Sequence, residues 1–142
     1  MPVDPPVPSP PVDSLSVMRR FRLALLPQRL AVCRLAPDAP IPQWASGSFV
    51  AITRTPRELS IVCDESAVPD GVRRATGFRA FEVAGPLDFS EVGVLASLAQ
   101  PLADAGVSLF AISTFDTDYV LVREADVDRA AKALAAAGHL GV

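Results

Sequence analysis

Residues Gly85–Val122 read GPLDFSEVGVLASLAQPLADAGVSLFAISTFDTDYVLV, and this stretch decides the fold. Its first part predicts a helix over Ser90–Ala105, because apolar residues recur there at the spacing of one helical face. That face holds Leu95, Leu98, Ala99 and Leu102. Two apolar runs follow, Val107–Ser113 and Asp118–Val122, and the short turn TFDT joins them as a strand hairpin.

The flanking sequence completes a β–α–β–β–α order. Phe78–Ala84 precedes the stretch and alternates apolar with polar residues, as a half-buried strand does. Asp126–Ala137 follows it and predicts a second helix with one apolar face. A hairpin placed between two helices in this order favours an antiparallel sheet with helices on one face. This is the ferredoxin-like α+β architecture.

The first half of the chain predicts strands and little helix. Leu30–Leu35, Ser48–Thr53 and Glu58–Cys63 are apolar runs that suit strands, and the short turn RTPR makes the last two an antiparallel hairpin. Residues 64–77 are polar and predict a loop with one turn of helix at most. We expect Trp44 to form a hydrophobic lid on this half, with ring stacking on a ligand as the alternative.

Composition narrows the class of protein. With 142 residues, half of them hydrophobic, the chain suits one domain or two very small ones. A formal net charge of −3 and the lack of a basic stripe argue against nucleic acid as a partner. No apolar stretch reaches the ~20 residues that a membrane span needs. Residues 1–11 hold six of the 14 prolines and no Lys or Arg, so we expect residues 1–20 to be a disordered tail, not a signal peptide, and the protein to be cytoplasmic.

Few residues could carry chemistry. Cys33 and Cys63 lie in apolar, strand-like runs, where a cysteine is most often a buried small hydrophobe. His139 follows the end of the second helix, a position typical of a C-cap or a surface group. An enzyme would have to pair Cys63 with His139, so we expect no catalytic activity. Asp116 and Asp118 could share a divalent metal, but no third ligand is visible, and we expect neither a metal nor a cofactor.

Several motifs are shared with a known family. They are a GPLDFS-like helix start with Gly93 one turn in, the STFDTD strand end at Ser113–Asp118, and two first-half stretches, LAVCRLAPDAPIPQW at Leu30–Trp44 and ITRTPRELSIVC at Ile52–Cys63. On these motifs the chain resembles the small ACT-domain proteins related to the CASTOR amino-acid sensors and to the regulatory domains of aspartate kinases. The resemblance covers roughly residues 22–139.

The resemblance implies two ACT-like halves within a ferredoxin-like sandwich. The first, degenerate half would span residues 21–75, and the more complete ACT domain would span residues 76–142. ACT domains bind small effectors, usually amino acids, and pair side by side through their sheets. They are regulatory modules without chemistry of their own, which again implies that the protein is not an enzyme.

A ligand site is expected where the predicted helix begins. Backbone N–H groups at a helix start suit the α-carboxylate of an amino acid, and Gly93 would permit a close backbone approach. The carboxylates of Glu91 and Asp118 could face the same small cavity and attract a cationic group. By resemblance, the positions that match ligand contacts are Asp88, Glu91, Thr114, Phe115 and Asp118. The wall supplied by a second ACT unit matches Val107, Ser108 and Leu109.

Two functions from different classes remain. The first is a homodimeric amino-acid sensor, with a preference for a basic amino acid because two carboxylates lie near the expected pocket, and with a regulated protein partner that reads the dimer geometry. The second is a ligand-free dimerisation or protein-interaction module. The Glu91 and Asp118 pair distinguishes them, since a ligand-free module has no need to bring these two carboxylates together.

Overall fold

The structure is a computed structural model, and it describes residues 20–87 and 92–142. The expected tail therefore falls outside the described residues, except for Arg20. The predicted contacts Asp88 and Glu91 also lie outside them, as does Ser90, the first residue of the predicted helix.

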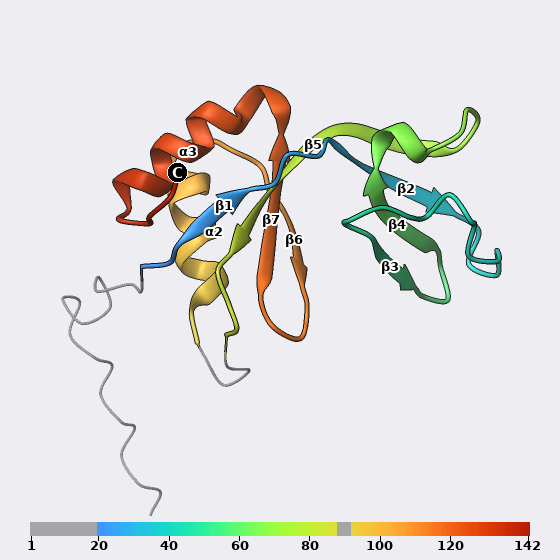
Figure 1. Ribbon diagram of the computed structural model, residues 1–142, viewed down its shortest axis with the longest axis horizontal. Helices are drawn as coiled ribbons and strands as arrows, with labels where there is room; N and C mark the ends of the chain where they lie inside the picture. Colours follow the sequence, from blue (N-terminus) through green and yellow to red (C-terminus); the bar gives the residue numbers. More distant parts are fainter. Residues whose placement is uncertain (1–19, 88–91) are drawn as a thin grey trace, which may run out of the picture.

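The described chain forms one antiparallel sheet with two α-helices (Figure 1). The strands run in the order β3-β4-β2-β5-β7-β6, with β1 paired to β5 beside β2. This confirms the predicted antiparallel sheet of an α+β protein. The elements are β1 (Leu23–Leu25), β2 (Leu30–Leu35), β3 (Ala51–Arg54), β4 (Leu59–Asp64), η1 (Glu65–Ala67), β5 (Arg73–Val83), α2 (Val94–Asp104), β6 (Phe110–Ser113), β7 (Asp118–Arg123), η2 (Glu124–Asp126) and α3 (Val127–Ala136).

The long strand β5 joins two groups of strands. Its first residues pair with β2, and its last residues pair with β1 on the same side and with β7 on the other side. Figure 1 shows the two groups on either side of this strand. The predicted boundary between residues 75 and 76 falls inside β5, so one continuous strand crosses from the first unit into the second.

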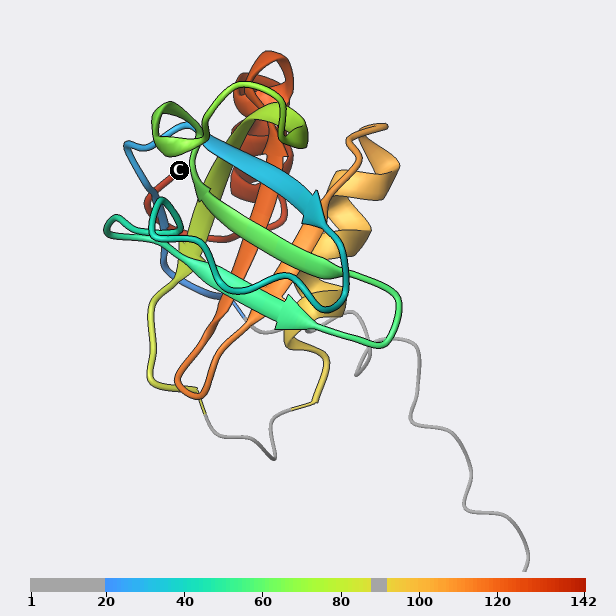
Figure 2. The same ribbon diagram turned by 90° about the vertical axis from the view of Figure 1, so that its right-hand side faces the viewer.

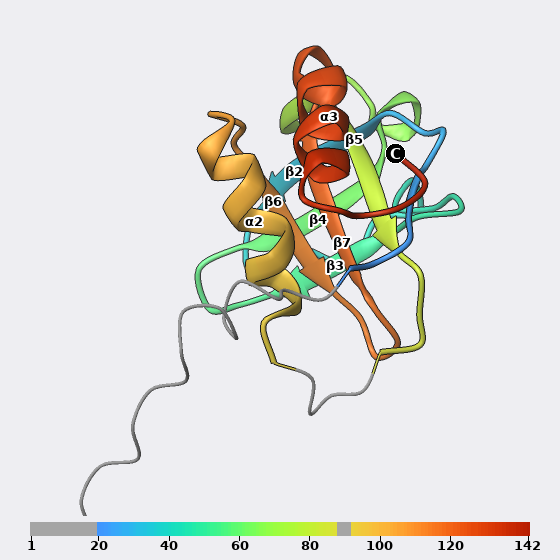
Figure 3. The same cartoon turned by 90° about the vertical axis from the view of Figure 1, so that its left-hand side faces the viewer.

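The C-terminal group has ferredoxin-like topology. Its elements run β5-α2-β6-β7-α3, and β1 from the start of the chain takes the outer place beside β5. Both helices pack on one face of these strands (Figure 3). The buried side chains of this core are Phe21, Leu23, Phe81, Val83, Val94, Leu98, Leu102, Val107, Val120, Val122, Ala130 and Leu134.

The N-terminal group has a smaller core without an α-helix. Ala31, Cys33, Leu59, Ile61, Cys63 and Val68 form it. The segment between β2 and β3 covers this core, and the half-buried Trp44 packs against it as the predicted hydrophobic lid. The predicted β3–β4 hairpin is also present, with Ile52 opposite Ile61.

A third cluster lies where the two strand groups face each other. Leu30, Val62, Ala80 and Leu121 are buried there. Phe49 meets the ring of Tyr119 edge-on, with ring centroids 4.9 Å apart, and the Tyr119 hydroxyl donates to Glu82 Oε2 over 2.8 Å. Burial, followed by this hydrogen bond, raises the pKa of Tyr119. Figure 2 shows the N-terminal strands in front of the C-terminal strands, with the helices behind both, so the molecule has three layers.

Four elements begin three or more residues later or earlier than predicted, and one of them is β3, which begins at Ala51 and not at Ser48. β5 begins at Arg73 and not at Phe78, because Arg73, Arg74 and Ala75 pair with β2 despite their polar pattern. α2 begins at Val94. β6 begins only at Phe110, because Val107 turns into the core under the helices and leaves the ladder.

His139 is buried and structural, which corrects the expectation of a C-cap or surface group. It is 5% exposed and stacks on Phe21. The Phe21 backbone N–H donates to its Nδ1 over 3.1 Å, so Nε2 carries the proton and donates to the Ser97 carbonyl over 2.9 Å. Leu140 then pairs with Arg22 in a parallel bridge. One imidazole thus ties the two ends of the described chain to helix α2.

Replacing His139 by Ala is expected to destabilise the protein by about 2–4 kcal/mol, because it leaves a cavity and two buried main-chain groups without partners. Urea denaturation measures this loss. The exposed Lys132→Ala in α3 is the matched control, with an expected change within about 0.5 kcal/mol. An equal effect of the two substitutions would contradict the structural role of His139.

Cys33 and Cys63 are free and buried, as predicted. Burial raises the pKa of the Cys33 thiol from 9.0 to about 11, and it raises the pKa of Cys63 as well. The folded state therefore holds these thiol protons more tightly than the unfolded chain does. The resulting stabilisation is complete below the unfolded pKa and is lost as the pH rises through the folded pKa.

We expect the free energy of unfolding to fall as the pH rises from about 9 to about 11, and Cys33→Ala to make this decline shallower. Chemical denaturation across this pH range tests this decline.

Burial of the two thiols also predicts slow chemical labelling. At about pH 8 a thiol reagent should label the native protein far more slowly than the unfolded chain. Equal labelling rates of the two states would show that the thiols are accessible.

Candidate functional site

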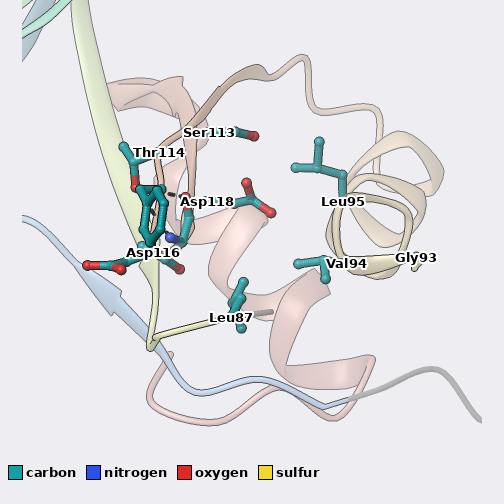
Figure 4. Close-up of a pocket in the computed structure, with 10 residues that line it drawn as sticks. Leu87, Gly93, Val94, Leu95, Ser113, Thr114, Asp116 and Asp118 are labelled. Atoms are coloured by element: carbon teal, nitrogen blue, oxygen red, sulfur yellow. Dashed lines mark hydrogen bonds between the residues drawn. The ribbon is translucent and has the colours of Figure 1, made fainter. Parts of the chain in front are cut away.

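A pocket of about 340 Å³ lies between the start of helix α2 and the turn of the β6–β7 hairpin (Figure 4). One wall is the six consecutive residues 113–118, which end β6, form the turn and begin β7. The other wall is Gly93, Val94 and Leu95, and Leu87 from the segment after β5 completes the lining. Three separate pieces of chain therefore build one site.

Hydrogen bonds hold the hairpin turn in place. Thr114 N donates to the Thr117 carbonyl over 2.8 Å, and the two hydroxyl contacts of Thr114 Oγ1 also stay within the turn. The Thr117 hydroxyl donates to the Val83 carbonyl, and Leu87 N donates to the Asp116 carbonyl over 2.6 Å. A Cβ on Gly85 would come within 2.9 Å of that same carbonyl. The predicted contact Thr114 thus shapes the wall of the pocket.

The helix start supplies backbone N–H groups. Gly93 is the N-cap residue, with a left-handed φ of 82°, and its carbonyl accepts from Ser97 N over 2.9 Å. The amides of Val94, Leu95 and Ala96 precede the first residue that can reach an intrahelical acceptor. These amides and the helix dipole favour an anion at this end of the pocket.

The backbone conformation of Gly93 is itself a reason for glycine at this position. A Cβ here would have nothing within 4 Å among the described residues, so no contact with them requires glycine, and the close approach of a ligand to this backbone stays a prediction. Its positive φ does require it, because a left-handed backbone is unfavourable for residues that carry a Cβ.

Asp118 brings an unpaired carboxylate to the pocket. It is half-buried at the start of β7, directly opposite Ser113 in the β6–β7 ladder. Figure 4 shows Asp118 and Ser113 pointing toward the start of α2, whereas Asp116 points away from it. Within the described part of the chain, no hydrogen bond or ion pair engages the Asp118 side chain. The pocket therefore presents an anionic group that faces a helix start suited to anions.

The remaining lining is apolar. Leu95 was expected in the helix core, but it is 38% exposed and lines the pocket. The helix is rotated so that Val94, Ser97, Leu98 and Leu102 are the buried positions. Ser97 is tolerated inside because its hydroxyl donates to the Val94 carbonyl over 2.7 Å. Phe115, a predicted contact, also lines the pocket and is 78% exposed.

The residues expected to face a second ACT unit lie elsewhere. Val107 is buried in the core under the helices, Leu109 is half-buried against that core, and Ser108 is exposed. All three precede β6, at the end of that strand away from the pocket. Within one chain they do not line it.

A metal site and a membrane-spanning helix were two further possibilities, and the described residues provide neither. They contain no group of three or more His, Cys, Asp or Glu side chains placed to hold a metal ion. None of the helices among residues 20–87 and 92–142 is long and apolar enough to cross a membrane.

Comparisons with known proteins agree with the fold and the motifs. The family model of the ACT domain matches residues 74–136. A second family model, described as an N-terminal domain, matches residues 28–71 and so begins after β1. The crystal structure of protein Atu0741 from Agrobacterium tumefaciens is 42% identical, covers 87% of this chain and 92% of that one, and superposes with a TM-score of 0.82. The chain belongs to the ACT-domain family.

One further relative and one structural neighbour are also similar to this chain. The human protein named cytosolic arginine sensor for mTORC1 subunit 1 is 34% identical over a 91-residue alignment, and the match covers 58% of this chain and 28% of the relative. This chain thus spans less than a third of that relative. The regulatory subunit of aspartate kinase from Thermus thermophilus covers 84% of this chain with 15% identity and a TM-score of 0.59, a likeness of fold alone. The family resemblance inferred from the motifs is confirmed.

Sequence reasoning missed part of the lining. Leu87 lies after the predicted strand Phe78–Ala84, where the alternation of apolar and polar residues has ended, so no pattern indicated its position. The hydrogen bond from Leu87 N to the Asp116 carbonyl places it beside the turn. Ser113 was predicted to end a strand and was not named as a ligand contact, yet its position opposite Asp118 turns its hydroxyl to the pocket. No local signal shows the orientation of α2, because Ser97 is buried whereas a serine in a helical pattern predicts an exposed position.

Substitutions at Gly93 separate backbone conformation from space. Gly93→Ala should cost about 1–2 kcal/mol of unfolding free energy, because alanine resists the left-handed φ. Gly93→Asn should cost less although asparagine is larger, since its side chain tolerates that region. Urea denaturation of both variants measures the two losses of unfolding free energy. A larger loss for asparagine would show that lack of space, and not conformation, selects glycine.

Proposed function

We propose that this protein is a regulatory module that binds a free amino acid in the pocket between α2 and the β6–β7 turn. The observation that carries the proposal is the unpaired, half-buried carboxylate of Asp118, which points toward the start of α2 across a pocket of about 340 Å³. An amino acid carries both charges that these two walls attract.

The chemistry assigns an orientation to the ligand. Its α-carboxylate accepts hydrogen bonds from the free amides at the start of α2, near Val94 and Leu95. Its ammonium group, or a cationic side chain, pairs with Asp118. Ser113 can bond either polar end, and the apolar surface of Leu87 and Leu95 packs against the aliphatic part. We propose a basic amino acid, because Asp118 has no cationic partner among the described residues and Glu91 was expected beside it.

Relatives support the class of ligand. The human relative is named as an arginine sensor, and the ACT-domain family model matches residues 74–136 of this chain. We propose that the present chain acts in the same general way without catalysis, in the cytoplasm, and that a protein partner reads its ligand-dependent state. Ligand binding would act by population shift, stabilising one of two arrangements.

We also propose that the chain comprises two ACT-like halves and works as a homodimer. β6 ends the sheet, so its outer side has no strand partner within the described chain. The pocket is open to solvent on one side, and residues 107–109 of a second copy could supply the missing wall. A ligand held between two copies would couple its own binding to the dimer geometry.

A ligand-free interaction module is the second candidate. The exposed apolar side chains Val92 and Phe115, at 88% and 78%, lie next to the pocket and favour a protein contact there. Such a module would bury these side chains against a partner and leave the Asp118 carboxylate without a ligand.

Thermal unfolding in the presence of each common amino acid, at millimolar concentration, tests the proposal. A ligand at 100 times its Kd adds about 2.7 kcal/mol, which raises the Tm by several degrees in a domain of this size. Asp118→Ala should abolish the shift. Asp116→Ala is the matched control, because its side chain lines the same turn but points away, and it should keep the shift.

The outcomes separate the two candidates. A Tm shift with a basic amino acid that depends on Asp118 supports the sensor. If the unsubstituted protein unfolds cooperatively and no amino acid shifts its Tm, the sensor proposal is contradicted and the interaction module is favoured.

A further inference from the structure

A second hollow, of about 290 Å³, lies on the N-terminal strands and shares no residue with the pocket at Asp118. It is formed by β2, β4 and the first residues of β5. The polar residues that line it are Arg34, Glu58, Ser60, Arg73 and Arg74. Its volume lies near the lower limit of the ~300–1,000 Å³ typical of small-molecule sites, so it suits a ligand of few atoms.

Two arginines stand directly opposite each other in this hollow. Arg34 and Arg73 are register partners in the β2–β5 ladder, where like charges on facing positions destabilise a sheet. Arg34 donates to the Arg57 carbonyl over 3.0 Å, which leaves its charge unpaired. The Arg73 side chain has no hydrogen bond or ion pair within the described residues. An anion between the two guanidinium groups would relieve this repulsion.

Glu58 adds the opposite charge nearby. Ser60 faces Arg34 in the β2–β4 ladder, and Glu58 lies two residues away on the same face. In the part of the chain that the structure describes, the Glu58 carboxylate pairs with neither arginine. Arg74 is held elsewhere, by the Val68 carbonyl at 2.9 Å and by Asp70 at 3.9 Å. The hollow therefore offers two unpaired cationic groups beside one unpaired anionic group.

We propose that this hollow is a second binding site, independent of Asp118, for a small zwitterion of the α-amino-acid type. The ligand carboxylate bridges the guanidinium groups of Arg34 and Arg73, each of which can bond it in a forked geometry. The ligand ammonium pairs with Glu58, and the Ser60 hydroxyl lies between them. Glu58 disfavours ligands that carry only negative charge, such as phosphate, since it would repel them.

Nuclear magnetic resonance of the ¹⁵N-labelled protein tests the site. Free L-amino acids are titrated to millimolar concentration, with acetate as a probe that lacks the ammonium. An amino acid should shift the amides of residues 32–34, 58–60 and 73–75, and Arg34→Gln or Arg73→Gln should abolish these shifts. Glu58→Gln should remove the preference for the amino acid over acetate. Well-dispersed spectra verify that each variant is folded.

Two controls isolate the hollow. Arg22→Gln removes an equal charge from an exposed position on another part of the sheet and should keep the shifts. Asp118→Ala should also keep them, which separates this site from the first pocket. The inference is overturned if no amino acid shifts these amides, if the shifts persist in Arg73→Gln, or if acetate shifts them equally in the unsubstituted protein, as an adventitious anion would.

Discussion

The structure depends on the continuity of β5. Eleven residues of unbroken strand pair with β2 near their beginning and with β1 and β7 near their end. Along its second half, Phe81 and Val83 face the helices, whereas Ala80 faces the N-terminal strands. One strand thus contributes to two cores through the alternation of its side chains. Separating the two strand groups would break the pairing of β5 with β2 or with β7.

Much of the fold could be predicted from the sequence, because local patterns decide it. Leu30–Leu35 forms a strand with the predicted bounds, and the helix after Asp126 follows its apolar periodicity. The pairing of β1 with β5 could not be predicted, because no local signal in Leu23–Leu25 says that its partner lies almost sixty residues away. The same holds for His139, whose two hydrogen bonds reach Phe21 and Ser97 across the whole C-terminal unit.

The candidate site shows a similar division. Asp118 stood out because aspartate is rare in strands, and the structure leaves it unpaired beside a helix start. Leu95 was misplaced because four apolar residues at helical spacing fit two faces that differ by a small rotation. The choice between them is made by tertiary packing, where His139 and the Val94 carbonyl satisfy the polar groups of Ser97. The N-terminal hollow depends on strand register, because the register places Arg34 opposite Arg73. Composition alone does not indicate that register.

The closure of the chain ends has a kinetic consequence. Phe21 and His139 are separated by 118 positions, and Leu23 N donates to the Leu140 carbonyl over 2.8 Å. The outer strand β1 is therefore among the first described residues to leave the ribosome, whereas His139 and Leu140, which bond residues 21–23, are among the last. Contacts of such sequence separation raise the contact order and slow folding, because a long loop must close before they form. The C-terminal core can be completed only after synthesis has passed His139 and Leu140, while the β3–β4 hairpin, made from near neighbours, can assemble earlier.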